Sequence, residues 1–68
     1  MTDKELEKAI ASMADAGSAQ VLAKMTIERN NPELIPVFLK RVLEKCQEGH
    51  HQTREFAIAG LKVLNETT

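Results

Sequence analysis

Apolar and polar positions along this chain repeat with the period of an α-helix in four successive segments. Turn-forming residues separate the segments at Gly17-Ser18, at Asn30-Asn31-Pro32 and at Gly49-His50-His51. No stretch shows the strict alternation of apolar and polar residues that marks a half-buried strand. The pattern therefore predicts an all-α domain of four short helices, paired as two helical hairpins. The helices are expected over residues 3–16, 18–29, 32–48 and 53–65.

Residues that cap helices place the ends of the first two segments. Thr2 followed by Glu5 is a capping-box pattern and predicts the start of the first helix. Gly17 suits the position just after a helix, where a left-handed backbone is common, so it is expected to end this segment. Ser18 is then expected to cap the second helix.

Two prolines complicate the start of the third helix. Asn31 is expected to be its cap and Pro32 its first residue, a position that proline tolerates well. Pro36 would then lie inside the helix, where proline removes a hydrogen bond and clashes with the preceding turn. Either residues 32–35 form a separate turn, or the helix kinks at Pro36.

The apolar stripes differ in width, and they define the expected core. The first and third segments are narrowly amphipathic, whereas the second and fourth are apolar around most of the helix. In the fourth segment, apolar residues and Gly60 cover about 200° of arc when residues are placed 100° apart. The predicted core comprises Leu6, Ile10, Met13, Leu22, Met25, Ile35, Phe38, Leu39, Val42, Leu43, Phe56, Val63 and Leu64.

Four helices of this length leave more apolar surface than a lone small domain is expected to bury. The alternative is that the two helices with broad apolar surfaces are simply packed between the two with narrow apolar stripes. Leu34 and Val37 also lie outside the stripe of the third segment. Exposed apolar patches mark interaction sites, so the sequence predicts a surface that binds another protein. The residues expected to form it are Phe56, Ala57, Gly60, Leu61, Leu64, Leu34 and Val37.

Gly60 suggests how such a surface is used. A glycine inside a helix costs about 1 kcal/mol relative to alanine, which indicates that another element packs too closely at Gly60 to admit a methyl group. Ala57 and Ala59 lie beside it. We expect a homodimer that crosses at this small-residue face, because two-fold contacts are the commonest oligomeric arrangement.

The second half of the chain resembles the helix pair of HEAT-type repeats. The stretch PELIPVFLKRVLEKCQEGHHQTREFAIAGLKVL, residues 32–64, has a proline in its first helix, a leucine-rich run, and an arginine that opens an alanine-rich second helix. The turn departs from the family pattern, because EGHHQ stands where an aspartate is usual. The resemblance implies a scaffold that binds proteins, in which these residues are structural. The matching residues are Pro36, Leu39, Leu43, Arg54, Ala57 and Leu61.

Composition narrows the classes of function. The 68 residues carry 9 Lys and Arg against 10 Asp and Glu, a net charge of −1 without the basic excess typical of nucleic-acid binding. No apolar run has the length of a membrane span, and the charged start MTDKELEK does not resemble a signal peptide. A single cysteine suits a reducing compartment. We therefore expect a cytoplasmic protein that needs neither a membrane nor a cofactor.

The residues best suited to chemistry are Cys46, His50 and His51. Cysteine and histidine bind zinc, but a structural zinc site takes four ligands and this cluster offers three. Gly49 also interrupts the helix between them. A core cysteine beside two solvated turn histidines is the preferred interpretation, and a metal site is the alternative.

Three classes of function remain, in order of preference. A non-enzymatic interaction or regulatory protein comes first and a helix-turn-helix DNA-binding regulator second. In the second case the third helix would be the recognition helix, but its start is acidic and apolar, so its basic residues Lys40, Arg41 and Lys45 would contact DNA from the far end. An enzyme dependent on a metal or a thiol is a distant third.

Overall fold

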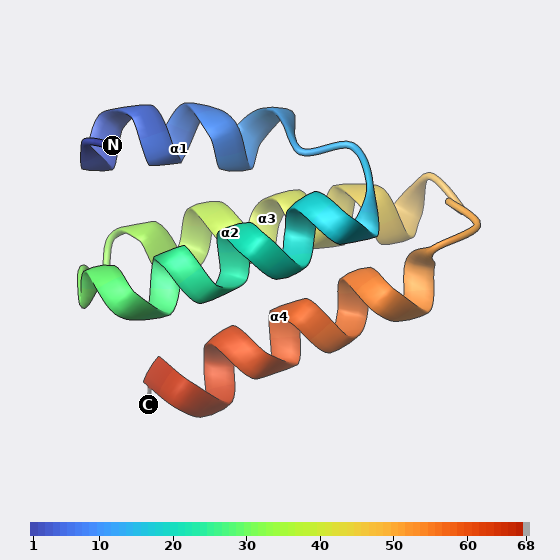
Figure 1. Ribbon diagram of the computed structural model, residues 1–68. Helices are drawn as coiled ribbons and strands as arrows, with labels where there is room; N and C mark the ends of the chain where they lie inside the picture. Colours follow the sequence, from blue (N-terminus) through green and yellow to red (C-terminus); the bar gives the residue numbers. More distant parts are fainter. Residues whose placement is uncertain (68) are drawn as a thin grey trace.

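Four helices make up residues 1–67, the part of the chain that the computed structural model describes, and these residues form no strand (Figure 1). Helix α1 spans Asp3–Ser12, α2 spans Ala16–Arg29, α3 spans Leu34–Gln47 and α4 spans Thr53–Thr67. The predicted all-α class and the number of helices are confirmed.

Successive helices run in opposite directions, so α1–α2 and α3–α4 are two antiparallel hairpins (Figure 1). In the view of Figure 1, α2 and α3 lie between α1 above and α4 below. Helix α4 packs on both α2 and α3, whereas α1 packs on α3 and, less extensively, on α2. Helices α2 and α3 therefore lie at the centre of the fold, covered on one side by α4 and on the other by the more peripheral α1 (Figure 1).

The core contains most of the residues that the stripes predicted. Leu6, Ile10, Phe38, Phe56 and Val63 are fully buried, and they join helices α1, α3 and α4 into one cluster. The other predicted core residues that are buried are Met13, Leu22 and Val42. Those that are half-buried are Met25, Ile35 and Leu39.

Leu43 and Leu64 were predicted in the core and are exposed instead, with 57% and 38% of their surface accessible. Leu43 lies about 140° around the helix from Phe38, because it is five positions farther along the chain and each position turns the helix by 100°. The apolar stripe predicted for the third helix was therefore too wide, because it included Leu43. Leu34, expected at the surface, is only 2% exposed, because it lies one turn before Phe38 on the same face.

The boundary between α1 and α2 differs from the prediction. Helix α1 ends at Ser12, and Asp15 rather than Ser18 caps α2, with its Oδ1 accepting a hydrogen bond from the backbone N–H of Ser18 at 2.8 Å. Gly17 therefore lies inside the first turn of α2. Starting the helix one turn earlier places Ala16 in the core, where it is 3% exposed.

The start of α3 resolves the question raised by Pro36. Helix α3 begins at Leu34, so Pro36 is its third residue, where a backbone N–H would have no partner inside the helix. Asn31 does not cap the helix: its side chain accepts from the N–H of Glu33 at 3.0 Å, and its carbonyl accepts from the N–H of Leu34 at 3.1 Å. The separate turn before the helix is thus the correct alternative.

Candidate functional site

Large apolar side chains are exposed mainly on α3 and α4. Leu43 of α3 and Ile58 and Leu61 of α4 have 57%, 52% and 58% of their surface accessible, and Leu64 has 38%. Among the described residues, the other exposed large apolar side chains are Met1 and Val21. Since four of these six side chains lie on one hairpin, that hairpin is the first candidate for a site.

Gly60 brings the two helices of this hairpin close together. A Cβ atom added at Gly60 would lie 3.2 Å from Cγ1 of Val42 and 3.7 Å from Cδ2 of Leu39. Nearer the turn, Sγ of Cys46 donates to the carbonyl of Thr53 at 3.9 Å. These contacts set the antiparallel register of α3 against α4.

This register places two apolar rows next to each other on the outside of the hairpin. With Leu39 beside Gly60 and Cys46 beside Thr53, Leu43 lies near Ala57, and Leu39 lies near Leu61. Ile58 and Leu64 widen the row on α4, and Pro36 extends the row on α3. We name the surface formed by both rows the α3–α4 face; its residues are Pro36, Leu39, Leu43, Ala57, Ile58, Leu61 and Leu64.

Charges of both signs border the α3–α4 face, because Glu33 at the start of α3, Glu44 of α3, and Glu55 and Glu66 of α4 are exposed beside its basic residues. Lys40 of α3 and Arg54 and Lys62 of α4 are exposed. The ion pairs among residues 1–67 join Arg29 to Asp3, Arg41 to Glu44 and Lys45 to Glu48. None of them involves Lys40, Arg54 or Lys62, so these three cations remain available to a ligand.

Part of the predicted binding surface is accessible and part is not. Leu61 and Leu64 are exposed and Ala57 is half-buried, all on the α3–α4 face. Val37 is half-buried and packs against the core. It lines a hollow between α1 and α3, on another side of the molecule.

Phe56, Gly60 and Leu34 were also expected at the interface, and they are buried within the chain. The sequence argument about Gly60 identified a real close approach, but the element that packs there is α3 of the same chain. Gly60 is therefore covered by α3 of its own chain and is not accessible to a second copy.

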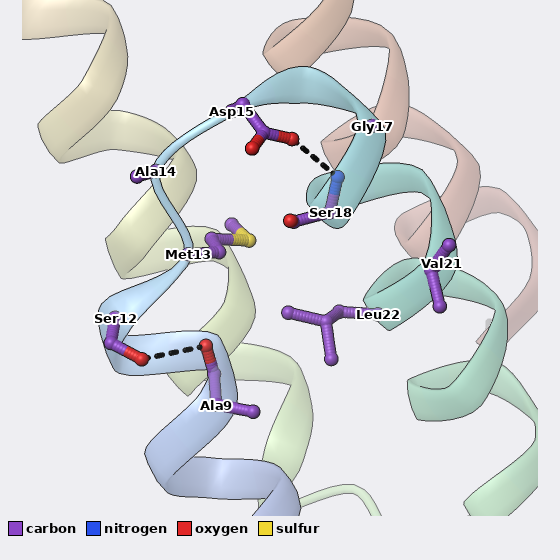
Figure 2. A pocket seen from close by; sticks show the side chains of 9 residues that line it. All are labelled: Ala9, Ser12, Met13, Ala14, Asp15, Gly17, Ser18, Val21 and Leu22. Atoms are coloured by element: carbon purple, nitrogen blue, oxygen red, sulfur yellow. Dashed lines mark hydrogen bonds between the residues drawn. The ribbon is translucent and has the colours of Figure 1, made fainter.

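A second concave region lies between the end of α1 and the start of α2, as shown in Figure 2. This open groove has a volume of about 650 Å³. Its apolar side chains include Met13, Leu22 and the exposed Val21, and most of the other lining residues are small. The full lining is Ala9, Ser12, Met13, Ala14, Asp15, Gly17, Ser18, Val21 and Leu22.

The polar groups of this groove are occupied by helix-end hydrogen bonds. Ser12 donates to the carbonyl of Ala9, and Asp15 accepts from the N–H of Ser18 (Figure 2). The latter bond holds the pKa of the Asp15 carboxyl below its ordinary value. Sequence reasoning missed the groove because it continued the first helix through residues 13–16, of which 13–15 in fact form the turn and part of the groove wall. The run of small residues from Ala14 to Ala19 was the available signal.

Cys46, His50 and His51 stabilise the turn between α3 and α4. The two histidine rings stack with centroids 4.4 Å apart, and His50 also meets the ring of Phe56 edge-on at 5.4 Å. Nδ1 of His50 accepts from the N–H of Gln52 at 3.0 Å. Within residues 1–67, no group of three or more His, Cys, Asp or Glu side chains is arranged to hold a metal ion.

Two of the three basic residues considered for DNA binding are engaged inside the molecule. Arg41 donates from Nε and Nη2 to the carbonyl of Met13, at 3.0 and 2.8 Å, and so satisfies the end of α1. Lys45 is only 7% exposed, pairs with Glu48 at 3.2 Å and lies 5.9 Å from the centre of the Phe56 ring. Lys40 alone among them is exposed and outside any ion pair in the described chain.

None of the helices within residues 1–67 combines the length and the apolar character needed to cross a bilayer. Comparison of the chain with protein-family models, with curated proteins and with solved structures finds no match.

Proposed function

We propose that this chain is a non-enzymatic protein-interaction module and that the α3–α4 face is its binding surface. The observation that carries the proposal is that Leu43, Ile58 and Leu61 are all exposed on one hairpin. The register of α3 against α4 brings these positions to the outside of that hairpin. Single exposed apolar residues are ordinary on protein surfaces, but contiguous groups mark sites of interaction.

The core is complete without these side chains. The chain exposes 4379 Å², against about 4,300 Å² expected from the size scaling of folded monomers. Phe38, Phe56 and Val63 are fully buried although the α3–α4 face is open. Burial of the exposed leucines is therefore not needed to complete the core of the monomer, which favours a role for these residues in binding.

The resemblance to HEAT-type repeats supports the same surface. Of the six residues that carry the resemblance, five belong to the α3–α4 face, and Arg54 lies at its edge. A helical-repeat unit buries its remaining apolar face by stacking on a neighbouring unit. In this chain the α1–α2 hairpin covers one side of α3–α4, and the α3–α4 face is the side left for a neighbour.

A helix-turn-helix role receives less support from the arrangement of charges. Arg41 and Lys45 would have to leave the carbonyl of Met13 and the Glu48 carboxylate before they reached phosphate groups. Removing a buried charge from its partner is costly. The interaction module is therefore the function that the geometry supports best.

Paired variants test the proposal. Leu43→Gln with Leu61→Gln removes apolar surface outside the core, and Val21→Gln, at a site with 61% exposure on α2, is the matched control. We expect quantitative affinity capture from the source cells to lose its specific partners with the double variant and to keep them with the control. Retention of the same partners by a folded double variant would contradict the proposed surface.

A further inference from the structure

The turn between α1 and α2 indicates how the chain pairs with a second copy of itself. The turn comprises residues 13–15, and the backbone of Met13 and of Asp15 is extended, with ψ angles of 135° and 163°. We propose that this turn straightens into helix, so that α1 leaves its own chain and packs on α2 and α3 of a second copy, whose α1 packs on the first. The resulting species is called the exchanged dimer below.

The residues of the turn are compatible with a helix. Met13 and Ala14 are good helix formers and continue the apolar spacing of α1, which is why the sequence predicted a longer first helix. Residues 13–15 include neither proline nor glycine. The turn therefore depends on tertiary contacts and on its cap, chiefly the burial of Met13, the bonds from Arg41 to the Met13 carbonyl, and the Asp15 cap of α2.

A straightened chain could not bury its own α1. One continuous helix over residues 3–29 would be about 40 Å long, whereas the longest dimension of the monomer is 29 Å. Its first third would then project beyond the body of the molecule. At 100° per residue, the buried side of α1 would also point roughly 150° away from the buried side of α2. Burial of Leu6 and Ile10 in this form therefore requires a second copy.

The surface that α1 covers is apolar, but α1 fills it loosely. Leu6 and Ile10 are fully buried in one cluster with Phe38 of α3. Hollows lie on both flanks of the helix: the groove of Figure 2 between α1 and α2, and a hollow of about 430 Å³ between α1 and α3. Helix α1 also packs on α2 and α3 less extensively than α4 does. Of the four helices, α1 is therefore the one that exchanges at the lowest cost in contacts.

The second copy's α1 fits this surface because it has the same sequence as the helix it replaces. In a two-fold exchange, Leu6 and Ile10 regain their places in the core, and Asp3 again pairs with Arg29 and Asn31, now between copies. At micromolar concentration a chain keeps its own α1, because a short tether gives that helix an effective concentration of about a millimolar. The exchange does not involve the α3–α4 face, which stays open in both forms.

Asp15→Ala tests the exchange. In the monomer the Asp15 side chain caps α2, whereas a continuous helix needs no cap at this position and alanine is the better helix former. The change therefore favours the exchanged form once in each chain. Sedimentation equilibrium and light scattering up to about 1 mM cover the effective concentration of the tether. We expect the dissociation constant of the dimer to fall at least about tenfold relative to the wild type.

Thr2→Ala is the matched control. The side chain of Thr2 caps α1 by accepting from the N–H of Glu5 at 3.1 Å, and α1 begins at this cap in both forms. Its loss should lower the melting temperature and leave the dissociation constant unchanged. Mixed samples of isotope-labelled and unlabelled Asp15→Ala chains identify the contact. We expect nuclear Overhauser effects between α1 of one chain and α3 of the other, at Leu6, Ile10 and Phe38.

Four results would overturn the exchange. Asp15→Ala could stay monomeric over the whole concentration range, or dimerise no more tightly than Thr2→Ala. It could lose its cooperative thermal transition, although the exchanged dimer keeps the core intact. It could also form a dimer that Leu61→Gln dissociates and that shows no Overhauser effects between α1 and α3 of different chains. This last result would place the contact between copies on the α3–α4 face.

Discussion

At the scale of single residues, neighbouring positions of α3 have very different surroundings. Phe38 is fully buried in the cluster that joins α1, α3 and α4, whereas Leu43 has 57% of its surface accessible on the outside of the same helix. The energetic importance of a large apolar side chain here depends on which side of α3 it occupies.

Phe38→Ala should therefore be far more costly than Leu43→Ala. Truncation of a buried phenylalanine costs about 3–5 kcal/mol, which is comparable with the whole stability of a small domain. Leu43→Ala should change the free energy of unfolding by less than about 0.5 kcal/mol. Urea unfolding followed by circular dichroism measures both, and similar effects of the two variants would show that α3 presents a different face to the core.

Gly60 allows a second test at this scale. An alanine there would gain about 1 kcal/mol of helix propensity, but its Cβ would lie only 3.2 Å from Cγ1 of Val42. We expect Gly60→Ala to give no stabilisation in the wild-type chain. In a Val42→Ala background, where Cγ1 is absent, the same change should stabilise by about 0.5–1 kcal/mol. Equal effects in both backgrounds in a double-mutant cycle would exclude the close contact.

At the scale of elements, polar groups at the helix ends attach α1 and α2 to the rest of the molecule. Thr2 and Glu5 form a reciprocal capping box at the start of α1, with bonds of 2.9 and 3.1 Å. Asp15 caps α2, and Arg41 reaches from α3 to the last carbonyl of the α1 end. At the start of α1, Asp3 accepts from Arg29 at 3.3 Å and from Asn31 at 2.9 Å, so this peripheral helix is held to the rest of the molecule at both of its ends.

The contact between Arg41 and the carbonyl of Met13 predicts that substitution of Arg41 weakens the local stability of α1. Arg41→Met keeps much of the apolar stem but leaves the carbonyl of Met13 without its two N–H donors. Amide hydrogen exchange in α1 should become faster, by about tenfold or more, while exchange in α4 changes less. Lys40→Met, at the exposed neighbouring position, is the control. Unchanged protection of α1 in Arg41→Met would show that the contact does not hold this helix.

The two acidic caps predict how stability depends on pH. Hydrogen bonds from the backbone N–H groups at Thr2 and Ser18 lower the pKa of Glu5 and of Asp15, whose ordinary values are 4.5 and 3.8. Because the folded-state pKa is depressed, their stabilisation is present above these ordinary values and is lost as the pH falls through the lower folded-state pKa.

Asp15→Asn checks the assignment for α2, since asparagine caps helices well and does not titrate. The melting temperature of the variant should fall less than that of the wild type when the pH is lowered from about 5 to about 3. Thermal melts at several pH values measure this difference. Parallel decreases in both proteins would assign the acid sensitivity to other groups.

Local sequence signals predicted which segments are helical better than they predicted the residues at which each helix begins and ends. The capping box at Thr2 lies within four residues of chain and was found from the sequence. Asp15 and Ser18 are both good caps, and the burial of Ala16 against the rest of the fold decides between them. The groove between α1 and α2 was missed for the same reason, because its turn lies where the first helix was expected to continue.

At the scale of the whole molecule, the arrangement of the hairpins decides which apolar surface remains outside. The sequence identified a close approach at Gly60, but it did not identify the partner, because Val42 is distant along the chain and only the tertiary register brings the two together. Of the residues expected at the binding surface, Leu61 is exposed and Phe56 is buried. The α3–α4 face became visible only when the register of the two helices was known.

The closed core predicts the state of the isolated chain. Because the large core side chains are fully buried within one chain, we expect a folded monomer at micromolar concentration. Light scattering should give a mass near 7.6 kDa, with a cooperative thermal transition. A stable dimer would show that the exposed apolar residues of this surface are sufficient for two copies to associate.

The position of α4 in the chain has a consequence for biosynthesis. Helix α4 packs on α2 as well as on α3, and it supplies Phe56, Ala59 and Val63 to the core. Until this last of the four helices has been synthesised, the sides of α2 and α3 that α4 covers remain exposed, although α1 packs on both helices. At about 5–20 residues per second, that interval lasts seconds, during which a nascent chain exposes Leu22 and Phe38 to chaperones and to aggregation. Folding of this protein should therefore follow the synthesis of α4 rather than accompany that of the earlier helices.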